Sequence, residues 1–253
     1  MTQAPAPTKA ATKSSLRPAK DERPDRKYSI LLAAEKLFAE RGFHAVSIRD
    51  IADEAQVPLA LVGYYFGQKH ELYHAIFEHW SSTIDERLAA LQEALQSPQA
   101  GDRLQRAVEA FIEPVIRLRA SPEGEYYALL MSRGLSQQTS GDDAVIREFF
   151  DPLANAFIDG LHGILSKEFA GCTRGQIAWC YQFLLGSLLH HITDVRVERL
   201  SGGQSKANAP QAQAMLVKFI VGGIRAALPL PLPKKSTPPT KASTTPTRRR
   251  RHP

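Results

Sequence analysis

The sequence predicts an all-α protein with a small N-terminal domain and a larger C-terminal helical bundle. Apolar residues recur at intervals of three and four through most of residues 28–228, and no stretch alternates apolar and polar residues over the length of a β-strand. Capping signals at Ser47 and Thr173 also mark where individual helices begin. The chain has 253 residues and is 43% hydrophobic, which is enough for a sizeable core.

The two ends of the chain differ from the middle in composition. Residues 1–24 and 229–253 are rich in Pro, Thr, Ser, Ala and basic residues, and they have almost no large apolar side chains to offset the entropy cost of ordering. We therefore expect two disordered basic tails. The net charge of the chain is +6, yet residues 28–228 sum to about −5. Such tails either add salt-dependent attraction to phosphates or only solubilise the chain ends.

The N-terminal domain, residues 25–72, is predicted to contain three helices. In the first helix Ile30, Ala34 and Leu37 share one face, and Gly42 lies where such a helix ends.

The second and third helices are short and are joined by a tight turn. Ser47, with Asp50 three residues later, starts the second helix by a capping box in which Asp replaces the usual Glu or Gln. The turn covers residues 56–58, and Pro58 suits the first position of a third helix, Leu59–Tyr65. Two short helices after a longer one predict a helix-turn-helix.

The C-terminal domain, residues 73–228, is predicted to consist of longer helices. One helix runs from about Leu72 to Leu95 and joins the two domains. Pro114 and Pro152 are expected to kink or interrupt two of the later helices. These later helices are expected at residues 102–119, 124–138, 143–169, 173–199 and 209–227.

Three runs in the N-terminal third carry a family resemblance: Ile30–Phe43 (ILLAAEKLFAERGF), Ile48–Ala52 (IRDIA) and Tyr64–Lys69 (YYFGQK). In order and spacing they resemble the DNA-binding domain of the tetracycline-repressor (TetR) family. The resemblance implies a homodimer with two recognition helices in successive major grooves of operator DNA, and a divergent C-terminal domain that dimerises and binds an inducer. It implies a transcriptional repressor released by a small molecule, and not an enzyme.

Three positions depart from the family pattern. Gln56 replaces the common turn glycine, Leu61 stands where a DNA-contacting Thr is frequent, and Gly63 stands where a Tyr or Asn often lies. The DNA-binding role is compatible with these changes, but the operator sequence cannot be carried over.

Phosphate contacts are expected at both ends of the helix-turn-helix. Ser47 and the first amides of its helix can accept a phosphate, because a helix N-terminus presents unpaired N–H groups and partial positive charge. Tyr64 and Tyr65 can donate phenolic hydrogens to phosphates, and Lys69 adds a charge beside them. The alternative for the tyrosines is packing beneath the next helix, and for Lys69 an ordinary solvated lysine.

Base contacts are expected from the start of the third helix. Pro58, Leu59, Ala60 and Gly63 offer small or apolar surface that suits thymine methyl groups. We therefore expect modest direct readout, helped by DNA shape. The basic pair at residues 26–27 is either a DNA-contacting arm or an idle basic end.

The C-terminal domain carries weaker signals for a ligand. Residues 147–152 (REFFDP) and 183–190 (FLLGSLLH) are similar to a TetR branch that includes fatty-acid-responsive regulators, which implies an apolar inducer such as a fatty acid or an acyl derivative. Five aromatic residues of this domain either enclose such a ligand or belong to an ordinary core: Phe111, Tyr127, Phe150, Trp179 and Phe183.

Dimerisation is expected through the last two long helices. Gly186, Ser187, Gly222 and Gly223 are small residues among large apolar ones, and they permit close helix approach in a four-helix interface.

One motif points to a different class of protein. His70, Glu71 and His74 form the pattern H-E-x-x-H, which in zinc proteases places two ligands and a general base on one helix. However, Trp80 stands where the metzincin extension requires His, and Glu93 lies on the same helix as the motif. A zinc metalloprotease therefore ranks below a DNA-binding regulator, and an apolar-ligand carrier without a DNA function is a third hypothesis.

The remaining features predict a cytoplasmic protein without metal, cofactor or membrane partner. Cys172 and Cys180 make neither a disulfide framework nor a CxxC metal site. No apolar run reaches the length of a membrane helix, and the N-terminus lacks the apolar region of a signal peptide.

Overall fold

The computed structural model describes residues 25–137, 143–207 and 209–228, and within these ranges every regular element is helical. The predicted disordered tails lie outside the described residues. The α-helices are α1 (Arg26–Arg41), α2 (Ile48–Glu54), α3 (Leu59–Phe66), α4 (Lys69–His79), α5 (Ser81–Gln96), α6 (Arg103–Ala120), α7 (Glu125–Gln137), α8 (Asp143–Val145), α9 (Asp151–Leu165), α10 (Arg174–Thr193), α11 (Val197–Leu200) and α12 (Pro210–Ala227).

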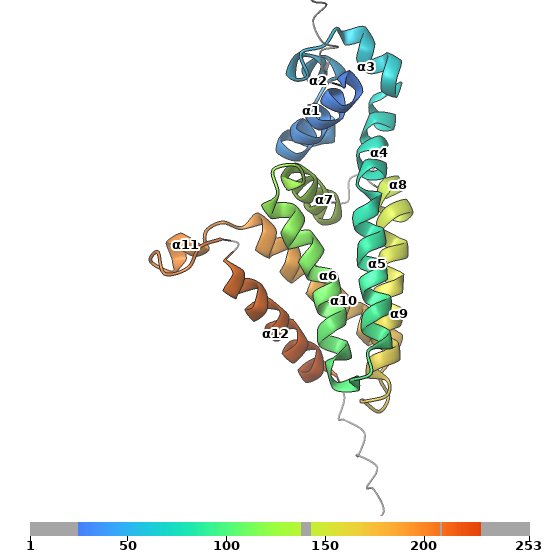
Figure 1. Ribbon diagram of the computed structural model, residues 1–253, viewed down its shortest axis with the longest axis vertical. Helices are drawn as coiled ribbons and strands as arrows, with labels where there is room; N and C mark the ends of the chain where they lie inside the picture. The colour runs from blue at the N-terminus through green and yellow to red at the C-terminus, as the bar shows by residue number, and fades with distance from the viewer. Residues whose placement is uncertain (1–24, 138–142, 208, 229–253) are drawn as a thin grey trace, which may run out of the picture.

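The molecule is elongated, and helices α1 to α3 are gathered at one end, where they form the head of the molecule (Figure 1). Helices α4 and α5 follow each other as a rod along one side, and α9 lies beside α5. Helices α5 to α12 make up the rest of the molecule, the body. Helix α6 packs against α5, α7, α9 and α12 and so forms the centre of the body. Helix α7 packs against α1, so the N-terminal helices contact the body at a second place besides the rod.

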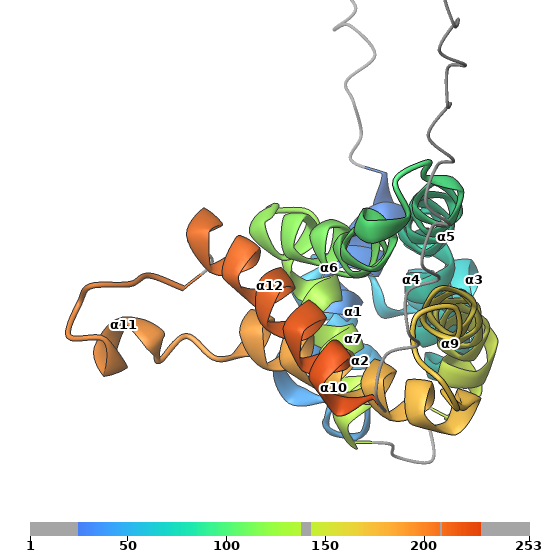
Figure 2. The same ribbon diagram turned by 90° about the horizontal axis from the view of Figure 1, so that it is seen from below.

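The α11 segment projects from the body beyond α10 and α12 (Figure 2). Among the described residues, no helix is long and apolar enough to cross a membrane.

Local signals explain how the N-terminal helices begin and end. The Asp25 side chain accepts hydrogen bonds from the amides of Lys27 and Tyr28 and so caps α1, which ends at Gly42 with φ 85°. The predicted capping box at α2 is present, because Ser47 and Asp50 each accept a hydrogen bond from the other's amide. Buried apolar residues from α1, α2, α3 and α4 then close a common core: Ile30, Leu37, Phe38, Ile51, Val62, Leu72 and Ile76.

The turn between α2 and α3 explains one departure from the family pattern. Gln56 has φ 54°, a left-handed conformation that favours glycine. The turn therefore has a conformation typical of glycine while carrying a side chain. Pro58 caps α3 instead of occupying its first helical position, one residue away from the prediction.

The predicted helix from Leu72 to Leu95 is wrong in one respect, because α4 ends at His79 and α5 begins at Ser81. Trp80 lies between them with ψ 7°, and its indole is hydrogen-bonded to a residue of α1. The helix predicted at residues 143–169 is also divided, since a π-helical segment, Ile146–Phe150, precedes α9. Pro152 lies in the first turn of α9, whereas α6 continues through Pro114.

Candidate functional site

Helix α3 presents one face to solvent along its whole length. Val62 is its one buried residue, whereas Pro58, Leu59, Ala60 and Gly63 are exposed. A Cβ added at Gly63 would meet no atom within 4 Å, so packing within the chain does not require glycine at this position. The four residues predicted to face DNA bases therefore form a continuous small or apolar surface.

The tyrosines at the end of α3 are accessible to solvent. Tyr64 is 79% exposed, and its ring meets the ring of the exposed Tyr65 at 5.1 Å in an edge-on arrangement. The alternative in which Tyr64 packs beneath α4 is therefore wrong. Both phenol groups lie on the outside of the helix-turn-helix.

Lys69 is neither a solvated lysine nor an unengaged charge beside the tyrosines. Its ammonium donates hydrogen bonds to the carbonyls of Phe43, at 3.0 Å, and Val46, at 2.9 Å. It also lies 4.4 Å from the centre of the Phe43 ring. Lys69 thus holds the connection between α1 and α2 against the start of α4. The sequence could not indicate this contact, because the two carbonyls lie more than twenty residues earlier in the chain. An ammonium has three donors, so one remains for another partner.

The start of α2 is less open to a phosphate than the sequence suggests. The Ser47 hydroxyl lies 2.5 Å from the Asp50 carboxylate, and the Ser47 amide donates to the same oxygen at 2.7 Å. These hydrogen bonds hold the pKa of Asp50 below its usual range, so the carboxylate is charged at neutral pH. A phosphate bound here would meet that charge. Arg49 in the same turn is exposed and brings a compensating cation, which makes it a phosphate-contact candidate that the sequence did not single out.

The H-E-x-x-H motif does not form a metal site. The Glu71 carboxylate accepts a hydrogen bond from the Gln68 amide at 2.6 Å and completes a capping box at the start of α4. His74 pairs instead with Glu148, at 2.9 Å. In the part of the chain that the structure describes, no group of three His, Cys, Asp or Glu side chains is arranged to hold a metal ion.

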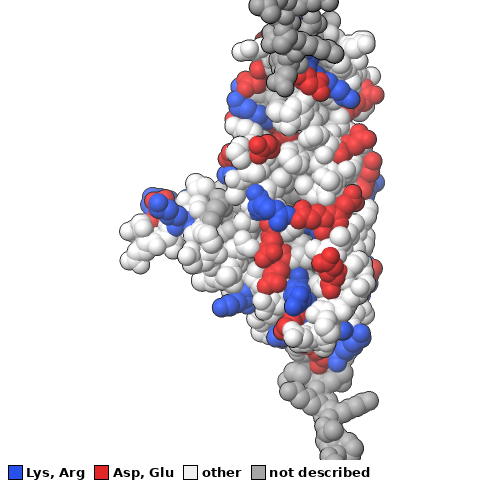
Figure 3. Space-filling view, viewed as in Figure 1, with Lys and Arg blue, Asp and Glu red and all other residues white. Residues whose placement is uncertain are grey.

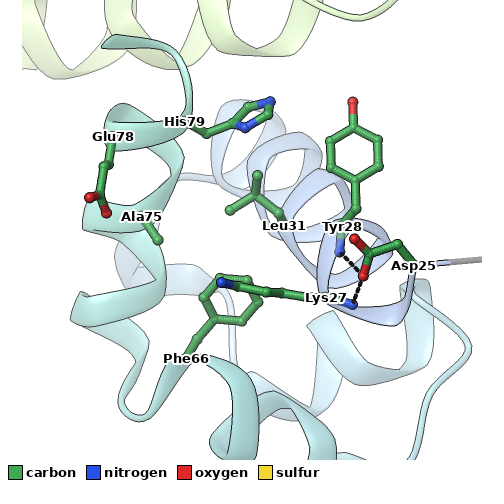
Figure 4. A pocket seen from close by; sticks show the side chains of 8 residues that line it. All are labelled: Asp25, Lys27, Tyr28, Leu31, Phe66, Ala75, Glu78 and His79. Atoms are coloured by element: carbon green, nitrogen blue, oxygen red, sulfur yellow. Dashed lines mark hydrogen bonds between the residues drawn. The ribbon is translucent and has the colours of Figure 1, made fainter.

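A groove lies between the start of α1, the end of α3 and α4 (Figure 4). The basic pair predicted as an arm ahead of the first helix lies within the first turn of α1. The Lys27 ammonium is 5.6 Å from the centre of the Phe66 ring and lines this groove with Tyr28 and His79. Lys27 therefore lies on helix α1, exposed beside this groove, and not on an extended arm.

A polar junction joins the helix-turn-helix to the body. Glu35 of α1 is 1% exposed and accepts a hydrogen bond from the Trp80 indole at 2.7 Å. The Trp80 ring stacks on Tyr127 of α7, with centroids 5.3 Å apart and planes 18° apart. Burial raises the pKa of Glu35 to about 7, although the hydrogen bonds from Trp80 and the Tyr127 backbone oppose the shift. One cluster thus touches α1, the α4–α5 break and α7.

The five aromatic residues predicted around a ligand do not gather at one place. Phe111, Tyr127 and Phe150 are buried in the body, and Tyr127 and Phe150 line a small cavity between α5, α6 and α7. Trp179 and Phe183 are 66% and 62% exposed, so their placement around an interior ligand is wrong. The buried face of α10 is formed by other residues, including Ile177, Cys180, Leu184 and Leu188.

Helices α10 and α12 share an exposed apolar face. Besides Trp179 and Phe183, it includes Met215 and Phe219 of α12, which are also strongly exposed. Added Cβ atoms at Gly186, Gly222 and Gly223 would meet no atom within 4 Å, so no packing within the chain explains these glycines. On the face drawn in Figure 3, acidic and basic side chains are interspersed among other residues.

Comparison with known proteins confirms the predicted family. Residues 30–76 match the family model described as bacterial regulatory proteins of the tetR family, and residues 109–223 match the tetracyclin repressor-like C-terminal domain. Together these two matches cover more than half of the chain. The protein belongs to the TetR family, whose members are helix-turn-helix transcriptional regulators and not enzymes.

Individual relatives are also HTH-type transcriptional regulators. HbdR of Aromatoleum sp. (strain CIB), an HTH-type transcriptional regulator, is 33% identical over 167 residues, which is 63% of this chain and 66% of HbdR. FasR of Mycolicibacterium smegmatis, an HTH-type transcriptional activator, is 34% identical over 92 residues, which is 36% of this chain and 41% of FasR. The matched segments thus span less than two thirds of each of these relatives.

Solved structures confirm the fold class. The ketosteroid transcriptional regulator KstR2 of Mycobacterium tuberculosis aligns with a TM-score of 0.55 and 19% identity, covering 79% of this chain and 95% of KstR2. The fatty acid degradation regulator FadR of Bacillus halodurans aligns with a TM-score of 0.54 and 15% identity, covering 81% of this chain and 98% of FadR. An all-α protein with an N-terminal helix-turn-helix and a C-terminal helical domain was the prediction from sequence.

Proposed function

We propose that this protein is a homodimeric transcriptional repressor that reads operator DNA with α3 and releases it when an apolar small molecule enters the body. The exposed face of α3 carries this proposal. A helix that leaves a small and apolar face in solvent presents a surface that another molecule can cover. A major groove is wide enough to admit such a helix.

Base and phosphate contacts are divided along α3. Pro58, Leu59, Ala60 and Gly63 face the base edges, where their small apolar surface suits thymine methyl groups. Tyr64 and Tyr65 donate to phosphates on the flank. Ser47 is a weaker phosphate contact, because its hydroxyl is engaged by Asp50.

Lys69 supports the phosphate contacts mainly by fixing the α1–α2 connection, with one donor left for a phosphate. Its two hydrogen bonds fix the connection between α1 and α2 against the start of α4. We therefore propose a positioning role for this lysine.

The dimer is proposed to form through the exposed face of α10 and α12. Trp179, Phe183 and Phe219 would be covered there by the same residues of a second copy, as a two-fold interface requires. The open glycines would let the helices of the two copies approach closely. Two recognition helices could then meet successive major grooves, roughly 34–36 Å apart.

The ligand is proposed to be a fatty acid or an acyl derivative that enters beside Tyr127 and Phe150. FadR is described as a fatty acid degradation regulator, but its likeness concerns the fold alone. The support in this chain is the apolar wall of the cavity between α5, α6 and α7. Since a regulator must reach the chromosome, we also propose that the protein acts in the cytoplasm.

A glycine substitution tests the DNA-reading role of α3. Gly63→Leu adds a side chain in open space, so it should raise helix stability by about 0.5–1 kcal/mol while lowering affinity for the DNA upstream of the protein's own gene at least about tenfold. Gly163→Leu is the matched control, because Gly163 is also exposed in a helix and open, but lies on α9. Affinity is measured by fluorescence anisotropy at two salt concentrations. Unchanged DNA binding by Gly63→Leu would contradict the assignment of α3.

A reporter gene behind the same DNA separates repression from activation. Curated relatives include the activator FasR and the repressor Rv3405c of Mycobacterium tuberculosis. The expected result is lower reporter expression with the protein present, restored by the ligand. Expression that rises with the protein would replace the repressor with an activator and leave the DNA-binding proposal in place.

A further inference from the structure

Arg87, on the face of α5 that packs into the body, is buried without a charge partner. It is 4% exposed, and its Nε has no hydrogen-bond partner. No carboxylate in the described part of the chain forms an ion pair with it, and its guanidinium lies 4.2 Å from the centre of the Phe111 ring. Burying a charged group without an opposite charge is strongly unfavourable. The arrangement is therefore incomplete unless an anion joins it.

The surroundings of Arg87 supply donors and apolar walls but no anion. The Tyr127 hydroxyl is also buried; Thr83 is the side chain that interacts with it, but not in the geometry of a regular hydrogen bond. Burial lowers the pKa of Arg87 to about 10, so the guanidinium remains charged at neutral pH, and the titratable groups that act on it are Tyr127 and Tyr181, both neutral there. Apolar side chains complete the cavity, among them Ile84, Val115, Leu118, Met131 and Phe150.

We propose that Arg87, with the Tyr127 hydroxyl, binds the carboxylate of an amphipathic ligand whose hydrocarbon tail lies among Leu118, Met131 and Phe150. This inference rests on the proposed ligand response and names its chemical class. A guanidinium presents paired donors that match a carboxylate, and a desolvated site strengthens that interaction. An ester or alcohol of the same length would occupy the apolar part of the cavity but leave Arg87 unpaired.

Because the cavity is small, binding of the ligand must displace helices that also contact the DNA-reading head. Its volume of about 10 Å³ holds roughly one water molecule, so a ligand must part α5, α6 and α7 to enter. Tyr127 on α7 stacks on Trp80, which donates to Glu35 of α1. Arg133 of α7 also donates to the carbonyl of Glu40, near the end of α1. Displacing α7 therefore moves contacts that hold the head against the body.

Thermal unfolding of the full chain with defined probes tests the proposal. The probes are octanoate, dodecanoate and hexadecanoate below their micelle concentrations, each compared with its methyl ester. We expect at least one carboxylate to raise the unfolding midpoint and to bind at least about thirtyfold more tightly than its ester. Arg87→Met should remove this preference, while Arg117→Met, on the exposed side of α6, should keep it.

Folding of the variant is checked by its unfolding midpoint without ligand. Because Met replaces an unpaired buried charge with apolar volume, Arg87→Met should be at least as stable as the wild type. Should Arg87→Met not fold, Arg87→Lys takes its place. Lysine keeps the charge but lacks the planar guanidinium, so the ratio of carboxylate affinity to ester affinity should fall and remain above one.

Three results would overturn the proposal: no midpoint shift with any of the carboxylates, equal binding of carboxylate and ester, or an unchanged preference in the Arg87 variant. These readouts need no DNA. If the protein fails to bind DNA but the preference depends on Arg87, the proposed function fails and the carboxylate site stands. If DNA binding is present and the preference is absent, only the carboxylate site fails.

Discussion

Glu35 makes the stability of this protein depend on pH in a direction opposite to that of most carboxylates. Its pKa is about 7 in the folded protein and 4.5 in its ordinary environment. Between these two values the unfolded chain has lost the proton that the folded protein retains, so the free energy of unfolding falls as pH rises. Below pH 4.5 and well above pH 7 both states carry the same charge on this group, and its contribution no longer changes.

The perturbation that isolates this effect is Glu35→Gln. The difference between the two pKa values corresponds to about 3 kcal/mol. Gln keeps an oxygen that can accept from the Trp80 indole but carries no ionisable proton. The variant should therefore gain stability relative to the wild type, by up to about 3 kcal/mol, between about pH 5 and about pH 8.

Urea unfolding of both proteins at these two pH values measures the effect. The comparison uses the difference between variant and wild type, because other groups oppose Glu35 in the same range. His191, for example, has a pKa lowered by burial, so its contribution to stability is lost as pH falls. A difference that is the same at both pH values would refute the assignment of a raised pKa to Glu35.

Three further predictions follow from individual contacts. Gln56→Gly should raise the free energy of unfolding by about 0.5–1 kcal/mol without changing DNA affinity, measured by thermal unfolding and anisotropy, because glycine adopts φ 54° without strain; a loss of stability would contradict this. Lys69→Met should cost about 1.5–3 kcal/mol in urea unfolding, since two carbonyls lose a charged donor; an unchanged midpoint would show that the bonds are unimportant. Trp179→Glu combined with Phe219→Glu should give monomers in sedimentation experiments and keep the helix content measured by circular dichroism; persistent dimers would place the interface elsewhere.

The helices were predictable because their signals are local. Ser47 and Thr173 begin helices through side chains that reach only three residues ahead, and Gly42 ends α1 by its own backbone freedom. The apolar repeats then predicted the helical class and the boundaries of α6, α7 and α12, whereas the helix predicted at residues 173–199 ends at Thr193 and is followed by the separate α11. Such features depend on neighbours in the chain, which a sequence displays directly.

Features that depend on distant partners were missed. The break at Trp80 accompanies a hydrogen bond to Glu35, forty-five residues earlier. Lys69 is held by carbonyls that any sequence would supply, and side-chain chemistry alone does not reveal which ones it reaches. Trp179 and Phe183 were placed in the interior because large aromatic residues favour burial, whereas here they lie on the outer face of α10.

Arg87 could not be recognised as a buried residue from the sequence. It precedes Leu88 in a helix whose apolar residues recur every three or four positions, and charged residues beside such a stripe are normally solvated. Only the packing of α6 against α5 shows that this arginine is enclosed. The DNA-contact residues remain predictions, and the experiments on α3 decide them.

The open space at Gly63 has a consequence for how this regulator can diverge. Most side chains placed there would be accommodated without a clash in the chain and would raise helix propensity, so the fold exerts little selection against them. If α3 reads DNA as proposed, a duplicated copy of the gene could acquire a new side chain on this helix in a single step, while the body stayed unchanged. New target genes would then be reached through one position, without prior stabilising substitutions elsewhere.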